Sequence, residues 1–286
     1  MSQIDQNLPP FSDGGAAVIT GAASGVGLAA ARRFAALGMP VVLADLSGEK
    51  LRAAETSIRD AGGRVAAVPT DVSKPTDFER LRDLTHSQFG AVGVLMLNAG
   101  VAANPGGAWQ NLDAWRALME VNLWGVINGA QAFLPSMVAS GRPAYVIATG
   151  SKQGITAPPG NAAYNVSKAA LKTYTEALQH ELRNTANCKV SAHLLVPGFT
   201  FTGLTGGGGT NEKPPAAWTP EQVVEFMLQS LGRGDFYILC PDNDVTPEMD
   251  QKRMSWAMGD LIENRPALSR WHPDWQAKFA AFMAEP

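Results

Sequence analysis

The chain has 286 residues, of which 45% are hydrophobic and 17% charged, and its formal net charge is −3. This length accommodates either two domains or one α/β domain of about 250 residues, and both can bury a sizeable core. Charges of both signs are interspersed and no apolar run reaches the roughly 18–20 residues that span a bilayer, so we expect neither nucleic acid nor a membrane as a partner.

Short apolar runs alternate with helical patterns from Ala16 onward. Near-continuous apolar strands that alternate with helices indicate βαβ units, in which helices cover both faces of a parallel sheet. The sequence therefore predicts one doubly wound α/β domain over residues 1–286, with a mainly parallel sheet of about seven strands. We expect strands at about 16–20, 41–44, 64–69, 92–97, 145–149, 190–196 and 236–239, and helices at about 25–37, 49–61, 76–89, 113–137 and 162–183.

Two segments do not follow this alternation. Residues 1–13 are polar apart from a few positions and contain Pro9-Pro10, which predicts a loose N-terminal arm. Residues 199–220 contain four consecutive glycines at 206–209, which predict a loop. This loop either closes over a substrate or has no role in specificity, and the sequence leaves both possibilities open.

Two kinds of sequence signal are missing: a signal peptide and a cluster of metal-ligating residues. Residues 1–10 do not show the basic and then apolar order of a signal peptide. The two cysteines, Cys188 and Cys240, form neither a disulfide framework nor a metal-ligand cluster, and the four histidines are scattered. We therefore expect a cytoplasmic protein without a bound metal.

A glycine-rich turn joins the first predicted strand to the first long helix. Gly21, Gly25 and Gly27 let the backbone turn sharply and approach a pyrophosphate, whose charge the helix N-terminus stabilises. The alternative is an ordinary strand–helix turn. The position of the turn between a strand and a helix favours the binding of a dinucleotide.

Asp45 closes the second predicted strand, 18 residues after Gly27, near the spacing of about 20 typical of a ribose-binding acid. A carboxylate there accepts hydrogen bonds from the ribose hydroxyls and repels a 2′-phosphate. Neither Ser24 nor Leu46 supplies a cation that would neutralise such a phosphate. The sequence therefore predicts NAD rather than NADP, although a strand-end aspartate can also serve only in a turn.

Tyr164 and Lys168 lie four residues apart and hence on one face of a predicted helix. The unperturbed pKa of each side chain is about 10, and a neighbouring ammonium group is expected to lower the pKa of the tyrosine. Such tuning suits proton transfer to or from an alcohol. Considered alone, a Tyr–Lys pair at this spacing is more often part of an amphipathic surface.

Together these motifs resemble the short-chain dehydrogenase/reductase family, over about residues 16–239. The resemblance rests on the spacing of the turn glycines, on Tyr164-x-x-x-Lys168, and on three further motifs in the expected order. These are Asp71-Val72, Asn98-Ala99-Gly100 and Pro197-Gly198-Phe199-Thr200-Phe201-Thr202. The family usually has a second asparagine where this chain has Leu97, a change that we expect to alter sheet bonding more than chemistry.

The resemblance implies a Rossmann-type fold, a homodimer or homotetramer, and roles for particular residues. Ser151 would bond the substrate oxygen, Tyr164 would act as acid and base, and Lys168 would bond the nicotinamide ribose and support Tyr164. Asn122 would hold a water molecule that connects Lys168 to solvent, unless it is a buried packing residue. The implied NAD contacts are Gly21, Ser24, Gly25, Val26, Gly27, Asp45, Leu46, Asp71, Val72, Asn98, Ala99, Gly100, Tyr164, Lys168, Pro197, Gly198, Thr200 and Thr202.

The expected substrate residues are mostly apolar. We assign Gln153, Phe199, Leu204 and Trp218 to the substrate pocket, which suggests an apolar, cyclic or aromatic small molecule. Lys152 could meet an acidic substrate group, but a solvent-facing lysine is the preferred interpretation. In the C-terminal tail, residues 241–286, we expect the tryptophans to serve in packing or subunit contact, and these are Trp256, Trp271 and Trp275.

The sequence thus predicts an NAD-dependent oxidoreductase that interconverts a secondary alcohol and a ketone. Two alternatives stay open: an epimerase or dehydratase that retains bound NAD, and a non-catalytic NAD-binding regulator. The presence of all four catalytic residue types argues against the regulator, because a binding protein has no evident need for them.

Overall fold

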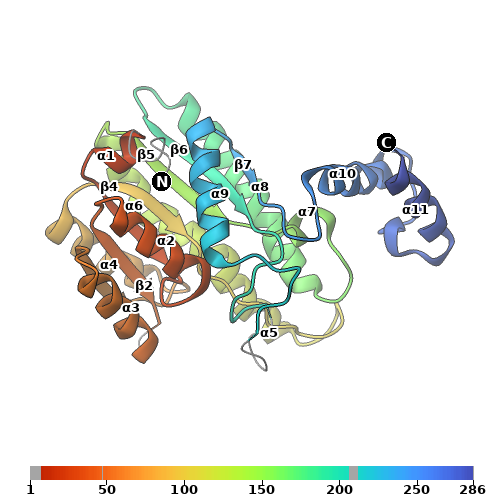
Figure 1. The fold of residues 1–286 in the computed structure, drawn as a ribbon, viewed down its shortest axis with the longest axis horizontal. Helices are drawn as coiled ribbons and strands as arrows, with labels where there is room; N and C mark the ends of the chain where they lie inside the picture. Colours follow the sequence, from red (N-terminus) through yellow and green to blue (C-terminus); the bar gives the residue numbers. More distant parts are fainter. Residues whose placement is uncertain (1–7, 47, 206–211, 286) are drawn as a thin grey trace.

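The computed structural model describes residues 8–46, 48–205 and 212–285. Seven strands form one fully parallel sheet in the order β3-β2-β1-β4-β5-β6-β7, which confirms the predicted fold class (Figure 1). The strands are β1 (Ala16–Thr20), β2 (Val41–Asp45), β3 (Val65–Pro69), β4 (Val92–Leu97), β5 (Ala144–Thr149), β6 (Val190–Val196) and β7 (Tyr237–Leu239).

The strands are apolar along their length because both faces of the sheet are covered. In β2, Val41 and Leu43 face one hydrophobic cluster, whereas Val42 and Ala44 face the other. The first cluster includes side chains of α2 (Gly25–Ala36), α3 (Glu49–Asp60) and α9 (Pro220–Arg233), of which α2 and α9 lie side by side (Figure 1). The second includes side chains of α4 (Pro75–Phe89), α6 (Gly125–Ala139) and α8 (Ala162–Asn184).

The chain reverses its direction across the sheet between β1 and β4. It first builds β1, β2 and β3 toward one edge, and then crosses to β4 on the other side of β1. In doubly wound sheets, ligands bind in the crevice outside the carboxyl ends of the strands at such a switch point. The topology therefore places a binding crevice beside the ends of β1 and β4.

One long helix predicted at 113–137 is divided into three pieces. Helix α5 (Leu112–Met119) continues into a π-helical segment, Glu120–Trp124, and then into α6. A π-helical turn carries an extra residue, and such turns occur frequently at functional sites. Here the inserted turn contains Asn122, whose side chain is fully buried.

The N-terminal arm is ordered over part of its length. Residues Pro9–Ser12 form the short helix α1, which starts with proline at its first turn. Phe11 is buried and its ring packs against the rings of Phe34 and Tyr145, with centroids 5.7 and 5.8 Å apart. The prediction of a loose arm is therefore wrong for these residues, because burial of one aromatic side chain fixes the segment against the sheet.

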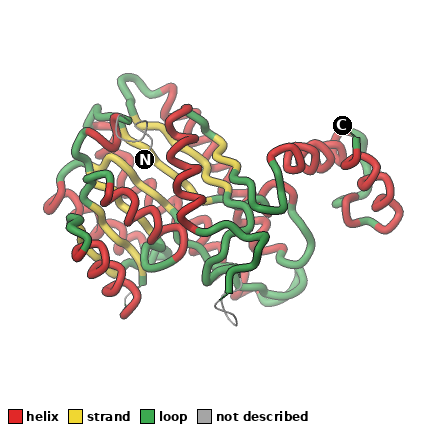
Figure 2. Tube along the Cα trace, viewed as in Figure 1, coloured by secondary structure: helices red, strands yellow, loops and turns green. Residues whose placement is uncertain are grey.

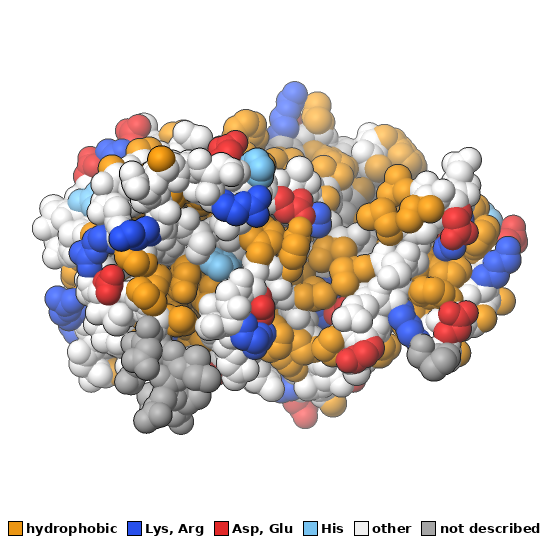
Figure 3. Space-filling model, turned by 90° about the horizontal axis from the view of Figure 1, so that it is seen from above, with side chains coloured by type: hydrophobic (Ala, Val, Ile, Leu, Met, Phe, Trp, Pro, Cys, Tyr) orange, Lys and Arg blue, Asp and Glu red, His pale blue; other side chains and the backbone are white. Residues whose placement is uncertain are grey.

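The C-terminal segment projects from the body of the molecule (Figures 1 and 2). It contains α10 (Pro247–Ile262), two short 3₁₀ turns and α11 (Gln276–Ala284). Trp256 of α10 is buried, with the rings of Trp275, Phe279 and Phe282 around it and its indole N–H bonded to Ser269. The segment thus packs through its own aromatic cluster, although hydrophobic side chains also remain visible on the surface at this end (Figure 3).

The four-residue helix α7 (Gln153–Thr156) lies between the long helix α8 and the C-terminal helix α10, and contacts both.

Among the described residues, no helix is long and apolar enough to cross a membrane. The same part of the chain contains no group of three or more His, Cys, Asp or Glu side chains that could hold a metal ion.

Candidate active site

A cavity of about 710 Å³ opens at the carboxyl ends of β1, β2, β4, β5 and β6. It is lined by every residue that the sequence assigned to the cofactor except Gly27, and by Ser151, Gln153, Phe199 and Leu204. The structure therefore gathers side chains and backbone from segments far apart in the chain into one site. Gly27, Asn122 and Trp218 are the assigned residues that do not line it.

The glycine-rich turn has the geometry that its sequence predicts. Gly21 and Gly25 have φ angles of +65° and +55°, a region that favours glycine. A Cβ atom on Gly21 would lie 2.9 Å from the Cα of Ala99, so β1 and β4 can approach this closely only without a side chain there. Gly27 lies behind the turn, where a Cβ would stand 2.3 Å from the carbonyl oxygen of Gly21. It serves close packing rather than the lining of the cavity.

Asp45 connects the end of β2 to this turn. One carboxylate oxygen accepts the N–H of Ala23 at 2.9 Å, and the other accepts the N–H of Leu46 at 2.8 Å. Each oxygen keeps a second lone pair, and the residue lines the cavity next to Ser24 and Gly25. The carboxylate is thus held in place beside the glycine-rich turn, with acceptor capacity left over at the edge of the cavity.

Asp71 uses its carboxylate within its own turn. One oxygen accepts the hydroxyl of Ser73 at 2.7 Å, and the other pairs with Lys74 at 3.2 Å. The hydrogen bond from Ser73 and the nearby ammonium group lower the pKa of this carboxyl below its ordinary value. Asp71 and Val72 both line the cavity beyond β3.

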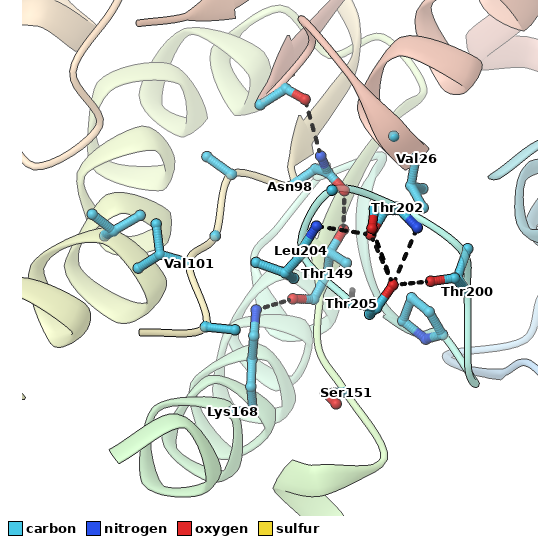
Figure 4. Close-up of a pocket in the computed structure, with 18 of the residues that line it drawn as sticks. Val26, Asn98, Val101, Thr149, Ser151, Lys168, Thr200, Thr202, Leu204 and Thr205 are labelled. Atoms are coloured by element: carbon cyan, nitrogen blue, oxygen red, sulfur yellow. Dashed lines mark hydrogen bonds between the residues drawn. The ribbon is translucent and has the colours of Figure 1, made fainter. Parts of the chain in front are cut away.

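Asn98 joins three neighbouring strands at the floor of the cavity (Figure 4). Its side-chain amide donates to the carbonyl oxygen of Thr20 at 3.1 Å, and its side-chain oxygen accepts the hydroxyl of Thr149 at 3.1 Å. Leu97 before it is buried in the core against α6, where a Cβ on Gly129 would meet the leucine side chain at 2.4 Å. Leu97, which stands where the family usually has an asparagine, is therefore an apolar packing residue of the core.

Lys168 and Tyr164 of α8 are both buried beside the cavity. The ammonium group of Lys168 donates to the carbonyl oxygen of Thr149 at 2.8 Å and lies 5.7 Å from the centroid of the Tyr164 ring (Figure 4). Burial lowers the pKa of Lys168 to about 8. A lysine with such a pKa exchanges protons near neutral pH.

The pKa of Tyr164 differs from the prediction. Burial raises the pKa of this phenol above its ordinary value, and a hydrogen bond with Ser151 acts in the opposite direction. The predicted lowering by Lys168 is wrong for this geometry, because desolvation of the phenolate outweighs the stabilising contacts. Tyr164 is thus protonated at neutral pH and is placed to donate a proton.

Asn122 holds the loop that follows β4. Its side-chain oxygen accepts the N–H of Val101 at 2.8 Å, and its amide group donates to the carbonyl oxygen of Val101 at 2.9 Å and to Ser167 at 3.1 Å. The hydroxyl of Ser167 in turn donates to the carbonyl oxygen of Tyr164. The π-helical turn therefore brings Asn122 to the side chain of Ser167 on α8, and Asn122 does not line the cavity.

Lys152 is not the solvent-facing lysine that the sequence suggested. Its side chain is only 19% exposed, and its ammonium group lies 2.6 Å from Asp250 and 3.6 Å from Asp242. These two aspartates follow β7, far along the chain, so no local pattern in the sequence could reveal the pairing. The ion pair between Lys152 and Asp250 therefore joins the segment after Ser151 to α10.

The assumed substrate residues divide into two groups. Gln153, Phe199 and Leu204 line the cavity, whereas Trp218 packs against the core with its ring 5.8 Å from that of Phe226. The assignment of Trp218 to the substrate is therefore wrong, because a backbone bridge to Thr200 turns it toward α9. Glycines 206–209 of the expected lid lie outside the described residues. The sequence missed other lining residues, namely Thr70, Val101, Ala102, Val121, Thr149, Gly150, Asn161, Gly203 and Thr205, and Lys152 lines the cavity as well.

A signal for some of these missed residues was present. Val101 and Ala102 directly follow the Asn98-Ala99-Gly100 motif and could have been assigned by continuity. Thr205 bonds through its hydroxyl to the backbone of Thr200 and Thr202, which shapes the loop at the mouth of the cavity (Figure 4). No motif marks Thr205, so only the folded loop identifies it.

Comparison with known proteins decides the family. A family model described as short chain dehydrogenase matches residues 15–213. This chain belongs to the short-chain dehydrogenase family. The resemblance inferred from its motifs is thereby confirmed.

Relatives of this short-chain dehydrogenase cover most of its length. The 1-deoxy-11-beta-hydroxypentalenate dehydrogenase of Streptomyces exfoliatus is 36% identical over 267 residues, which are 90% of this chain and 94% of that protein. An uncharacterised oxidoreductase of Listeria innocua is 37% identical over 222 residues, 75% of this chain and 89% of that protein. The chain is therefore an oxidoreductase that acts on a CH–OH group.

Solved structures of similar proteins contain nicotinamide dinucleotides. A short-chain dehydrogenase/reductase from Burkholderia phymatum in complex with NAD has a TM-score of 0.79 and 32% identity, and the match covers 88% of this chain and 95% of that one. A metagenomic short-chain oxidoreductase in complex with NADP has a TM-score of 0.66 and 30% identity, and the match covers 79% and 96%. Relatives of the family thus bind either form of the cofactor.

Proposed function

We propose that this short-chain dehydrogenase interconverts a secondary alcohol and a ketone with NAD as its cofactor. The observation that carries the proposal is the convergence of Ser151, Tyr164 and Lys168 on one cavity that also contains the glycine-rich turn and Asp45. One end of this cavity suits a dinucleotide, and the other end provides an acid next to a hydroxyl group.

The residues at the cofactor end fit NAD. Gly21 and Gly25 leave room for a pyrophosphate at the N-terminus of α2, and Asp45 would accept hydrogen bonds from the adenosine ribose. Lys168 would donate to the nicotinamide ribose, and Gly198, Thr200 and Thr202 would contact the nicotinamide. When bound, NAD supplies or accepts the hydride, which no side chain can do.

The chain's own residues would position the substrate and move its proton. Ser151 would donate a hydrogen bond to the substrate oxygen, and Tyr164 would give the phenol proton to that oxygen in reduction or remove it in oxidation. The ammonium group of Lys168 would stabilise the phenolate of Tyr164. We include in the proposal that Asn122, held by its bonds to Val101 and Ser167, would hold a water molecule that connects Lys168 to solvent.

The lining of the substrate end supports an apolar substrate. Val101, Val121, Phe199 and Leu204 contribute hydrophobic side chains, and Gln153 adds one polar group. The name of the Streptomyces exfoliatus relative refers to a hydroxylated carboxylic acid of the pentalenate type. We therefore propose a cyclic or polycyclic secondary alcohol, or an aromatic one, as the substrate.

The activity is tested by NADH oxidation with a panel of ketones: 2-butanone, cyclohexanone, camphor and 1-tetralone. We expect turnover with the cyclic members, and a loss of about a hundredfold to ten-thousandfold in kcat for Tyr164→Phe. Tyr174→Phe, on the same helix but outside the cavity lining, is the matched control and should retain activity. Residual turnover close to the wild-type rate in Tyr164→Phe would refute the acid–base role.

A flat response of the wild type, together with measurable NADH binding, would contradict the reductase proposal for these substrates. NAD that co-purifies tightly and is never released would favour an epimerase or dehydratase instead. Binding of free NADH without any chemistry would favour a non-catalytic regulator. Fluorescence titration with NADH and mass analysis of the purified protein distinguish these outcomes.

The choice of cofactor is tested by Asp45→Ala. We expect the KM for NAD to rise by about tenfold to a hundredfold, because a charge-assisted hydrogen bond is lost, and the KM for NADP to fall, because repulsion of the 2′-phosphate is removed. Asp60→Ala, an exposed aspartate at the end of α3, is the control. An unchanged ratio of the two KM values in Asp45→Ala would remove Asp45 from the ribose site.

A further inference from the structure

A cluster of four charged side chains lies beside Ser151, between α7 and the C-terminal segment, and one of them, Lys152, also lines the cavity. Lys152 pairs with Asp250 at 2.6 Å and with Asp242 at 3.6 Å, and Arg253 approaches Asp250 at 3.9 Å. The side chains of the two aspartates are 6% and 8% exposed, and those of the two cations 19% and 22%. The cluster is thus internal and carries two positive and two negative groups.

Lys152 is rigidly connected to the catalytic residues through its backbone. It directly follows Ser151, and its carbonyl oxygen accepts the N–H groups of Ile155 and Thr156, which forms α7. Gly154 of α7 packs on the backbone of Lys168, where a Cβ atom would lie 2.5 Å from the carbonyl carbon. A shift of the Lys152 backbone would therefore move Ser151 and α7 relative to α8.

Asp242 connects the same cluster to the opposite wall of the cavity. One of its carboxylate oxygens accepts the N–H of Phe199 at 3.0 Å and faces Lys152. The other accepts the N–H groups of Asp244 and Val245, which fixes the carboxylate in its loop. A Cβ atom on Gly198 would lie 2.9 Å from Asp242, so the segment before Phe199 is pressed directly against this carboxylate.

Asp250 adds the C-terminal helix to this arrangement. It is buried in the first turn of α10, and Lys152 is its shortest ion-pair partner. Buried ion pairs add little net stability compared with apolar side chains, but removal of one partner leaves an uncompensated charge. Lys152 and Asp250 meet here as an ion pair without hydrogen-bond geometry, and together with the bonds of Asp242 this pair joins Ser151, Phe199 and α10.

We propose that Lys152 is a positioning residue for the reaction, and that α10 is part of the active-site scaffold. Lys152 lines the cavity, but it would act by holding Ser151 and the Phe199 backbone at a fixed separation through Asp242 and Asp250 rather than by binding the substrate. This inference rests on the proposed function insofar as Ser151 bonds the substrate oxygen.

The test compares Lys152→Met, Lys152→Arg, Asp250→Asn and the double variant Lys152→Met with Asp250→Asn. Arg59→Gln, which breaks a surface ion pair with Glu55 on α3, is the control. Three measurements are made on the full chain. The first gives kcat and KM for NADH oxidation with 1-tetralone, or with another ketone of the panel that the wild type reduces. The second is thermal stability, and the third is hydrogen exchange of residues 150–157 and 198–204.

We expect kcat to fall by about tenfold or more in Lys152→Met and in Asp250→Asn, because a small misplacement of reacting groups is costly, while the KM for the ketone changes by less than about threefold. Both variants should exchange hydrogen faster in the two segments that flank the cavity. Lys152→Arg should recover most of kcat. The double variant should regain part of the thermal stability, because neither Lys152 nor Asp250 is then left as a charge without the other, although Asp242 and Arg253 stay charged, and it should keep a low kcat.

Three outcomes would overturn the inference. Recovery of kcat together with stability in the double variant would indicate a role in folding alone. A loss confined to the Lys152 variants, with Asp250→Asn like the wild type, would indicate that Lys152 contacts the substrate. Unchanged hydrogen exchange in both segments would show that the cluster does not position them. The exchange measurement needs no substrate, so it decides the inference even if no ketone of the panel is reduced.

Discussion

At the scale of one residue, the buried charge of Lys168 lowers the stability of the folded protein. Its ammonium group is buried and donates to the carbonyl oxygen of Thr149, a neutral acceptor that replaces only part of the lost hydration. Burial therefore lowers its pKa from 10.5 to about 8. Below pH 8 the lysine is charged in both the folded and the unfolded chain, and the folded state carries the full penalty.

We predict that Lys168→Met raises the free energy of unfolding at pH 7 by on the order of 1–3 kcal/mol, although it removes a functional group. The wild-type penalty should disappear as the pH rises from about 8 to about 10.5, because the unfolded chain then binds more protons than the folded one. Urea denaturation at pH 7 and at pH 10 measures the difference.

Lys172→Met, four residues further along α8, is the control for this prediction. Lys172 is partly exposed and paired with Glu176 at 2.7 Å, so its replacement should give no gain in stability. A lower free energy of unfolding in Lys168→Met than in the wild type at pH 7 would contradict the argument, since the lost hydrogen bond would then outweigh the buried charge.

Short elements set the geometry of this site at the next scale. Helix α7 has only four residues and begins two residues after Ser151, yet it contacts both α8 and α10. Its close approach to α8 depends on Gly154, because any Cβ atom there would lie within 2.6 Å of the carbonyl oxygen of Lys168. The position of Ser151 relative to Tyr164 therefore depends on the absence of a side chain at Gly154.

Gly154→Ala should lower the free energy of unfolding by about 1–3 kcal/mol, because the added methyl group overpacks the contact between α7 and α8. We expect kcat to fall as well, since Ser151 moves with α7. Thermal denaturation and the ketone assay measure the two effects. Gly203→Ala, whose Cβ would meet no atom within 4 Å, is the control for stability. Wild-type stability in Gly154→Ala would show that the helices adjust without strain.

The elements themselves were largely predictable from the sequence, but their local form was not. The apolar runs located the strands to within a few residues, because both faces of the sheet are buried. The π-helical turn at Glu120–Trp124 escaped prediction, since hydrophobic periodicity does not distinguish it from an α-helix. This turn contains Asn122, which forms two hydrogen bonds with the backbone of Val101, and only folding brings these two residues together.

At the scale of the whole molecule, the cavity and the packing of the N-terminal helix α1 lie at opposite ends of the strands. The cavity lies at the carboxyl ends of the strands, whereas α1 packs at the other end, where a Cβ on Gly93 at the start of β4 would lie 2.7 Å from the carbonyl oxygen of Pro10. Phe11 is 5% exposed there and joins the hydrophobic core. Changes at this end should therefore affect folding without altering cofactor binding.

Phe11→Ala should lower the free energy of unfolding by about 3 kcal/mol, since a buried aromatic side chain is removed and leaves a cavity. The Kd for NADH should stay within twofold of the wild type. Denaturation and fluorescence titration measure the two quantities, and Phe11→Leu, which keeps most of the volume, should cost less than about 1.5 kcal/mol. Loss of NADH binding in a folded Phe11→Ala would show that the two ends of the sheet are coupled.

The sequence by itself determined the doubly wound fold, the glycine-rich turn, the place of Asp45 and the pairing of Tyr164 with Lys168. Each of these is encoded within a short stretch, and parallel strands then bring their carboxyl ends together. Only the tertiary structure decided the raised pKa of Tyr164, the packing of Trp218 against the core and the ion pairs of Lys152 with Asp242 and Asp250. These properties depend on desolvation and on contacts between distant segments, which arise only when the chain is folded.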